Sequence, residues 1–215
     1  MRKKLILFDL DGTLMDAAPA IQAAADRVRP RFQLPPLPIR DVHTFLADPV
    51  AYGGETALLV PADADGKTRR DALMLFGRHL DVLFTDYAVP YAGVPELLQE
   101  LAAGQYRLAL VAHRITLFLY QWLDLIGWGT RFDPIVGIDA VVRPLPAPDA
   151  VQHALRVAHC KPEDALLVGN GGFALQAAHA AGIETVFTAY GYGKPQGFET
   201  AVLPQPAALL DFLTR

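Results

Sequence analysis

Cysteine is almost absent from this chain, and so are long apolar runs. The single Cys160 among 215 residues cannot form an internal disulfide, which fits a reducing compartment. The first apolar run ends after four residues at Asp9, whereas a secretory signal needs roughly 7–15 apolar residues. No run approaches the ~18 residues of a membrane span. We therefore expect a cytoplasmic protein without a membrane partner.

Charge of either sign is modest. Charged residues make up 20% of the chain, and the formal net charge is −4. This balance argues against a nucleic-acid partner, which would favour a basic face, but it leaves room for a small anionic substrate held by local cations. A hydrophobic content of 52% is enough for one core and a smaller accessory domain. No pattern in the sequence defines an oligomeric state.

Short apolar segments alternate with helical patterns along most of the chain. We expect strands at residues 4–8, 107–112, 165–168 and 184–188. We expect helices at residues 94–103, 147–159 and 173–181, with a short closing helix at 207–213. Continuous apolar strands that alternate with helices are typical of a parallel sheet covered on both faces. The fold class is therefore α/β, with a Rossmann-like three-layer core.

One long segment after the first strand departs from this alternation. Helical patterns are expected at residues 17–29 and 68–84, whereas 42–59 is ambiguous. No strong strand pattern occurs there. We therefore expect a mostly helical insertion at residues 16–87, between core segments 1–15 and 88–215.

The end of the first strand carries the most informative motif, Phe8-Asp9-Leu10-Asp11-Gly12-Thr13-Leu14. Side chains two residues apart on a strand point the same way, so Asp9 and Asp11 would share one site at the strand's carboxyl end. One carboxylate can attack a phosphoryl group, and the other can exchange a proton with the leaving oxygen. An Asp-Gly-Thr triplet alone is an ordinary turn. The full motif directly after a strand is far more specific.

With this motif, the sequence resembles the haloacid dehalogenase-like superfamily, and within it the phosphoglycolate phosphatase-like branch with a helical cap. The resemblance covers nearly the whole chain. Besides the first motif, it rests on Asp16-Ala17-Ala18-Pro19, Tyr91-Ala92-Gly93-Val94, Arg143-Pro144-Leu145-Pro146-Ala147-Pro148, Gly169–Gly182 and Tyr190-Gly191-Tyr192-Gly193. It implies that the helical insertion at 16–87 is a cap over the active site.

The resemblance also implies roles for the first motif. Asp9 would be the nucleophile and Asp11 the general acid and base, while Gly12 and Thr13 would bind the phosphate. Mg²⁺ would be the cofactor, held by Asp9, Asn170 and the backbone oxygen of Asp11. The substrate would be a small phosphorylated metabolite.

The second motif departs from the family pattern. The resemblance implies a strand that ends in Ser or Thr, whose hydroxyl binds the phosphate, but here Ala112 holds that position and has no donor. His113 and Arg114 follow it, and each is a candidate for contacting an anion. The alternative is that both are solvated surface residues, which is the usual place of an arginine.

The third motif also differs from the family pattern. A phosphate-binding lysine is implied there, and aligning the run of prolines puts Arg143 in its place. A second register puts Leu145 there. We prefer Arg143, because three prolines then align rather than two. Arginine keeps the charge of lysine but is bulkier and planar.

The fourth motif has lost its carboxylates. Asn170 and Ala174 stand where aspartates would complete the metal site, although Gly171 and Gly172 could still present backbone N–H groups to an anion. Mg²⁺ relies on carboxylates, so we expect their loss to weaken its binding strongly. A metal-independent dehalogenase fits poorly, because Asp11 is kept and the late acidic residue is missing.

Two hypotheses follow. One is a phosphatase-like hydrolase with an intact nucleophile motif and a degraded supporting shell, in which we expect phosphate-monoester hydrolysis to be weak or absent. The other is a catalytically inactive binding or regulatory protein of the same fold.

Overall fold

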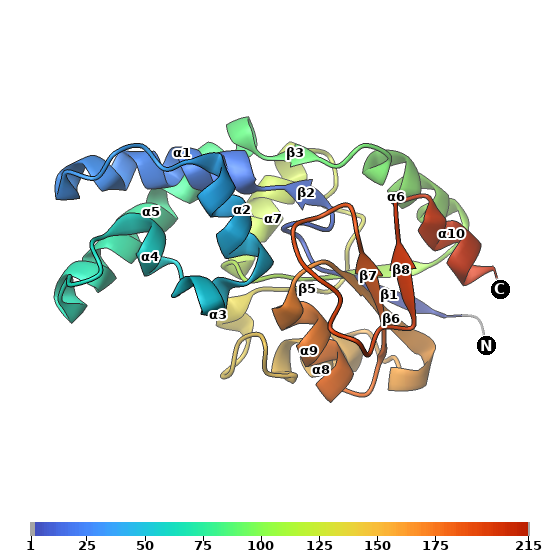
Figure 1. Cartoon of the computed structure of the whole chain (residues 1–215). Helices are drawn as coiled ribbons and strands as arrows, with labels where there is room; N and C mark the ends of the chain where they lie inside the picture. Colours follow the sequence, from blue (N-terminus) through green and yellow to red (C-terminus); the bar gives the residue numbers. More distant parts are fainter. Residues whose placement is uncertain (1–2, 215) are drawn as a thin grey trace. The chain divides into compact units, whose positions relative to one another are not determined.

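A computed structural model describes residues 3–214 and divides the chain into two compact units. One unit comprises the residues up to Met15 together with those from Pro90 onward, and the other is Asp16–Val89. The predicted return to the core at residue 88 thus falls two residues before this boundary. The chain leaves the first unit through β2 (Met15–Asp16) and returns through β3 (Val89–Pro90), which form a two-stranded sheet (Figure 1).

A six-stranded parallel sheet forms the centre of the first unit, in the order β5-β4-β1-β6-β7-β8. Its strands are β1 (Leu5–Phe8), β4 (Arg107–Val111), β5 (Ile135–Val136), β6 (Ala165–Gly169), β7 (Glu184–Thr188) and β8 (Ala201–Leu203). The three central strands are buried almost throughout. Burial on both faces accounts for their continuous apolar sequences.

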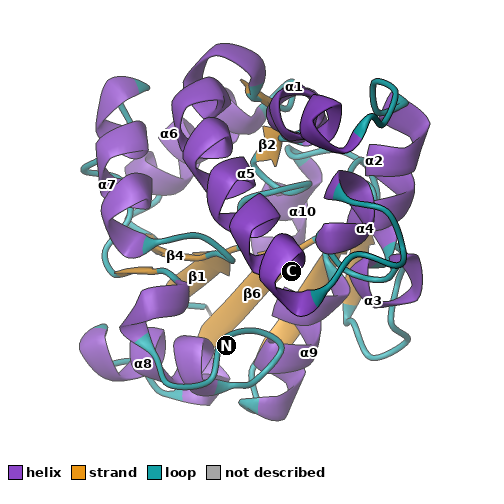
Figure 2. Cartoon of the chain, turned by 90° about the vertical axis from the view of Figure 1, so that its left-hand side faces the viewer, coloured by secondary structure: helices purple, strands orange, loops and turns teal. Residues whose placement is uncertain are grey.

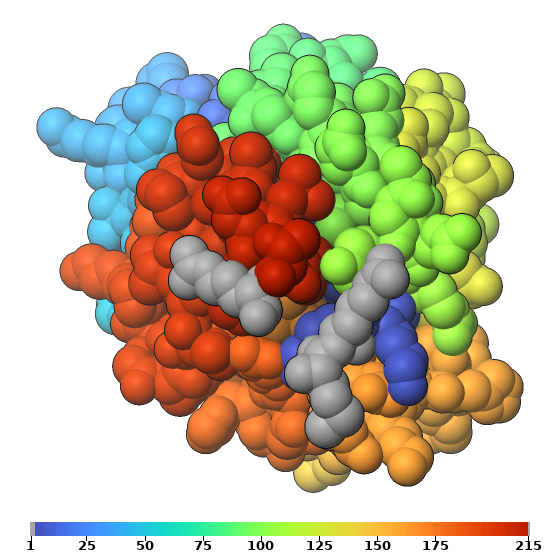
Figure 3. Space-filling view, turned by 90° about the vertical axis from the view of Figure 1, so that its right-hand side faces the viewer, coloured from blue at the N-terminus to red at the C-terminus, as the bar shows by residue number. Residues whose placement is uncertain are grey.

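Helices cover both faces of this sheet. They are α6 (Val94–Ala103), α7 (Thr116–Leu125), α8 (Asp149–Val157), α9 (Gly172–Ala180) and α10 (Ala208–Leu213), with 3₁₀ turns η2 (Ile138–Ala140) and η3 (Pro162–Asp164). On one face, α8 and α9 pack on alternate strand residues such as Leu5, Leu7 and Leu167. The other face carries α6 and α10, which lie side by side (Figures 1 and 3). This three-layer arrangement is visible edge-on in Figure 2.

The second unit is helical. It consists of α1 (Ala18–Val28), η1 (Arg29–Phe32), α2 (Ile39–Ala47), α3 (Pro49–Tyr52), α4 (Thr56–Leu59) and α5 (Gly66–Tyr87). Buried Arg29 organises its loops, because its guanidinium donates hydrogen bonds to the backbone oxygens of Pro35 and Leu58. None of the helices in the described part of the chain is long and apolar enough to cross a membrane.

The predicted fold class is confirmed. Each of the four predicted strands is present within one residue of its expected ends, and the ambiguous segment 42–59 is mostly helical. Apart from the 3₁₀ turns and the two short strands at the unit boundary, three elements of the core were not predicted. The strands β5 and β8 have only two and three residues, too few for a readable pattern, and α7 is apolar along most of its length, which hides its helical period.

Candidate active site

The first motif lies at the carboxyl end of β1, between two neighbouring strands. Phe8 is in register with Leu110 of β4 on one side and with Val168 of β6 on the other. The segments that follow these three parallel strands therefore meet at one edge of the sheet. They bring together Asp9, Asp11, Arg114 and Asn170, and all four belong to the first unit.

Asp9 lies partly buried at the centre of this edge. Its Oδ1 accepts a hydrogen bond from the backbone N–H of Leu10, with 2.8 Å between N and Oδ1, and the carboxylate also accepts one from Gly171. Burial, and then the charge of Asp11, raise the pKa of Asp9 to about 7; the two backbone N–H groups and Arg114 oppose this rise. Near neutral pH the predicted nucleophile is thus divided between its charged and neutral forms.

Asp11 forms an ion pair with Arg114. The distance from Arg114 Nη2 to Asp11 Oδ2 is 2.8 Å, and the two side chains are 8% and 27% exposed. Among the described residues, Asp11 Oδ1 has no hydrogen-bond partner although it is buried. Arg114 is therefore a buried member of the site, and its reading as a solvated surface residue is wrong. The signal in the sequence was its place two residues after the strand pattern at 107–112.

Asn170 holds two backbone segments together. Its Oδ1 accepts hydrogen bonds from the backbone N–H groups of Tyr192 and Gly193, at 2.7 and 2.8 Å, and its Nδ2 donates to the backbone oxygen of Thr188 at 2.7 Å. The residue is only 1% exposed. Its amide thus uses both a donor and an acceptor to anchor the loop after β7.

This loop packs directly on the first motif. The hydroxyl of Tyr190 donates a hydrogen bond to the backbone oxygen of Thr13 at 3.0 Å. Gly12 has a φ of +79°, which favours glycine, and a side chain there would meet Asn170. Thr13 is fully buried, and its hydroxyl has no hydrogen-bond partner among residues 3–214. The Tyr190–Gly193 segment thus fixes the turn that carries the two aspartates, a role that its spacing alone did not reveal.

Of the other predicted site residues, one is buried and two are exposed. Ala112 is buried, while His113 is exposed and its ring centroid is 6.5 Å from that of Phe173. Arg143 has a 70% exposed side chain, and its guanidinium binds Asp149, with 3.1 Å from Nε to Oδ1 and 2.9 Å from Nη2 to Oδ2.

The alternative position for the lysine is a core position. Leu145 is 6% exposed and packs in the cluster beneath α8 and α9. Ala174, where the second late aspartate is implied, is 1% exposed in the same cluster. Within the described residues, the cation that contacts an aspartate of the first motif is thus Arg114 rather than Arg143.

The donor set does not suit Mg²⁺. Three residues were expected to hold the ion, Asp11 through its backbone oxygen, but the side-chain oxygen of Asn170 already accepts two backbone N–H groups. Across residues 3–214, no three His, Cys, Asp or Glu side chains converge closely enough to hold a metal ion. The positive charge of Arg114 would also repel a cation bound beside Asp11.

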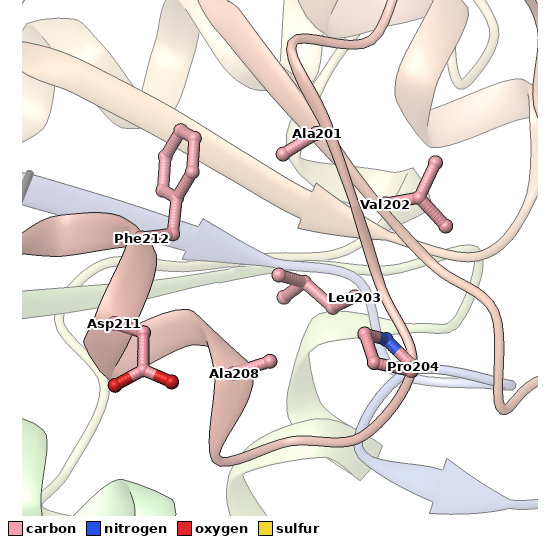
Figure 4. A pocket seen from close by; sticks show the side chains of 7 residues that line it. All are labelled: Ala201, Val202, Leu203, Pro204, Ala208, Asp211 and Phe212. Atoms are coloured by element: carbon pink, nitrogen blue, oxygen red, sulfur yellow. The ribbon is translucent and has the colours of Figure 1, made fainter.

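A shallow hollow of about 240 Å³ lies elsewhere on the core unit (Figure 4). It lies between β8 and α10 and is lined by Ala201, Val202, Leu203, Pro204, Ala208, Asp211 and Phe212. Asp211 is its sole charged side chain, so the hollow offers neither a nucleophile with a partner base nor a cation for an anionic ligand.

Comparisons with known proteins place the chain in a family. The sequence model of the family described as haloacid dehalogenase-like hydrolase matches residues 6–188. A phosphoglycolate phosphatase of Pseudomonas putida is 31% identical over 217 residues, which cover 98% of this chain and 77% of that protein. Phosphoglycolate phosphatase 1 of Pseudomonas aeruginosa is 30% identical over 204 residues, which cover 93% of this chain and 75% of that protein.

A solved structure shares the fold. A haloacid dehalogenase-like family hydrolase from Streptococcus pneumoniae superposes with a TM-score of 0.83 at 20% identity, and the match covers 98% of both chains.

Proposed function

Because the chain belongs to the haloacid dehalogenase-like hydrolase family and is phosphoglycolate phosphatase-like, we propose that its Mg²⁺-dependent hydrolysis of phosphate monoesters is weak or absent. The observation that carries this proposal is the engagement of Asn170, whose side-chain oxygen accepts two backbone N–H groups. An oxygen in that position is a poor ligand for a hard cation that needs several oxygen donors. Losing a metal ion removes several kcal/mol of transition-state stabilisation.

The chemistry proposed for the first motif follows from its two carboxylates. Asp9 attacks the phosphorus of a small phosphate monoester, the bond from phosphorus to the ester oxygen breaks, and that oxygen takes a proton from Asp11. Water then attacks the aspartyl phosphate and gives a proton to Asp11, which releases phosphate and restores the Asp9 carboxylate. Gly12 and Thr13 would position the phosphate.

Two features of the site oppose rapid turnover by this route. Asp11 Oδ2 accepts a hydrogen bond from Arg114, so Asp11 must leave that partner before this oxygen can carry a proton. Asp9, with its pKa raised to about 7, is only partly charged at neutral pH. Both features support slow hydrolysis.

A steady-state assay with p-nitrophenyl phosphate and phosphoglycolate, with and without Mg²⁺, tests this proposal. We expect kcat/KM of the wild type with Mg²⁺ to lie within about tenfold of that of Asp9→Asn, because the metal contribution is largely missing. Asp9→Asn serves as the control, since it removes the nucleophile. Turnover of several per second that depends on Mg²⁺ and on Asp9 would contradict the proposal.

A second candidate is a catalytically inactive binding or regulatory protein. The Asp11–Arg114 ion pair favours it, because it occupies the group that would exchange protons. Mass spectrometry after incubation with acetyl phosphate separates the two candidates. A phosphorylated Asp9 that is absent in Asp9→Asn would support the hydrolase, and an unmodified protein would support the binding function.

A further inference from the structure

We propose that this site binds a phosphate-type dianion without a metal ion, and that Arg114 exchanges its partner Asp11 for the anion. The proposal deepens the proposed function, on which it rests for the ligand class. It assigns the charge-neutralising role to a residue of the loop after β4.

The backbone of Arg114 is held firmly. Its carbonyl oxygen accepts a hydrogen bond from the backbone N–H of Ile138, with 2.9 Å between N and O. Gly137 lies so close that a side chain there would collide with the same oxygen. The guanidinium carbon lies 5.9 Å from the centroid of the Phe118 ring, which flanks the charge. The cation is therefore positioned by the fold before any ligand arrives.

Arg114 directly contacts one of the two aspartates of the first motif. Its Nη2 lies 2.8 Å from Asp11 Oδ2. Two carboxylates at one site repel a dianion, so a ligand needs a cation at that site. Arg114 supplies this positive charge. The side-chain oxygen of Asn170 already accepts two backbone N–H groups, so it is a poor ligand for a metal ion that would supply the charge instead.

The exchange of partners is chemically favourable. The guanidinium is a planar fork that matches phosphate oxygens in pairs, and a dianion attracts it more strongly than a single carboxylate does. Asp11 is the more exposed partner, at 27% against 8% for Arg114. It can therefore be released toward solvent while Arg114 stays in place.

Isothermal titration calorimetry with inorganic phosphate in EDTA tests the proposal. We expect the wild type to bind phosphate, and Arg114→Ala to bind it at least about tenfold more weakly, because charge-assisted hydrogen bonds are lost. Asp11→Asn should bind it about fivefold more tightly, because the competing carboxylate is gone. Replacing EDTA by excess Mg²⁺ should change the Kd by less than about twofold, since the metal adds little to a site neutralised by arginine.

Arg107→Ala is the matched control. Arg107 begins the strand whose far end leads to Arg114, is exposed, and donates a hydrogen bond to the backbone oxygen of Ala158. Its removal takes away the same charge at the opposite end of the strand, so phosphate affinity should stay within about twofold if the effect is local.

Several outcomes would overturn the proposal. These are no phosphate binding at millimolar concentrations, binding that requires Mg²⁺, equal losses in the two arginine variants, and an unchanged or weaker affinity in Asp11→Asn. If Arg114→Ala does not fold, the Asp11→Asn comparison decides alone. The turnover assay is a separate measurement, so rapid Mg²⁺-dependent hydrolysis would contradict the proposed function even where phosphate binds without metal.

Discussion

At the scale of single residues, three side chains set the charge of the site. Asp9 and Asp11 bring two carboxylates to one edge of the sheet, and Arg114 brings one guanidinium. The pKa of Asp9 rises to about 7 because burial and Asp11 outweigh the groups that favour its charge. The carboxylate that is predicted to attack phosphorus is therefore also costly to keep ionised in the folded protein.

This cost predicts how stability depends on pH. An unfolded aspartate has a pKa of about 3.9, whereas folded Asp9 has one of about 7. The folded state thus holds an extra proton between these values, and the contribution of Asp9 to stability is lost as the pH rises through 7. Asp9→Asn stays neutral. Its free energy of unfolding should exceed that of the wild type by about 2–4 kcal/mol at pH 8, and the gap should shrink toward pH 4.

Urea unfolding of both proteins between pH 4 and pH 8.5 measures this gap. Asp65→Asn is a control in which stability should depend on pH in the opposite direction. The backbone N–H of Thr68 holds the pKa of Asp65 below its usual range. The stability that Asp65 contributes is lost as the pH falls. A gap for Asp9→Asn that does not change with pH would show that the carboxylate is not strained by burial.

Asn170 leads to a second prediction at this scale. Its Nδ2 donates to the backbone oxygen of Thr188, and a carboxylate could not do so when charged. Asn170→Asp would restore the residue implied by the family pattern, yet we expect it to lower the free energy of unfolding by about 1–3 kcal/mol at pH 8, because two oxygens would face each other in a buried site. The loss should be smaller at pH 5, where a protonated carboxyl can donate.

Thermal or urea unfolding in EDTA at the two pH values checks this. Asn170→Ala loses every one of these hydrogen bonds at both pH values, and its deficit should therefore not depend on pH. An Asn170→Asp protein as stable as the wild type at pH 8 would mean that the amide donor is dispensable.

At the scale of elements, the loop after β7 is as important as the first motif. The Tyr190–Gly193 segment approaches the first motif so closely that a side chain at Gly191 would collide with the backbone oxygen of Gly12 and with the amide of Asn170. The aromatic rings of Tyr91 and Tyr190 meet at 5.2 Å between centroids, which adds apolar contact to the hydrogen bonds. The geometry of the aspartate turn thus depends on a segment far away in the sequence.

Gly191→Ala tests this close packing. The added methyl group must displace backbone atoms, so we expect a loss of about 1–3 kcal/mol in the free energy of unfolding, as for other overpacked sites. Gly77→Ala is the matched control, because Gly77 lies inside α5 with open space around it. That substitution should stabilise by about 0.5–1 kcal/mol through the helix propensity of alanine. Equal effects of the two substitutions in urea unfolding would argue against the close packing.

Element by element, the sequence predicted the regular parts well. Continuous apolar strands and amphipathic helices such as α8 carry strong periodic patterns, because burial on fixed faces demands them. The environment of Arg114 was not readable in this way. It depends on β4 lying beside β1, a pairing of residues about a hundred positions apart, and no local pattern records which strand neighbours which.

At the scale of the whole molecule, the chain consists of an α/β unit and a helical unit, and all candidate site residues belong to the first. The helical unit is contiguous in sequence, while the α/β unit is assembled from two segments. In its sheet, β1 lies between β4 and β6, two strands that follow much later in the chain. The first motif therefore acquires its partners only when the chain has folded.

The family, the fold class and the position of the aspartate turn can be read from the amino-acid sequence alone, because they follow from local patterns and one specific motif. The surroundings of that turn depend on how distant segments pack in the folded chain. In the sequence, Arg114 and Asn170 are only candidates for contacting an anion and a metal ion. Their observed roles arise from contacts with segments far away in the chain, 2.8 Å to Asp11 for Arg114 and 2.7 Å to Thr188 for Asn170. Burial and hydrogen bonding depend on the arrangement of the whole sheet, which residue identity alone does not specify.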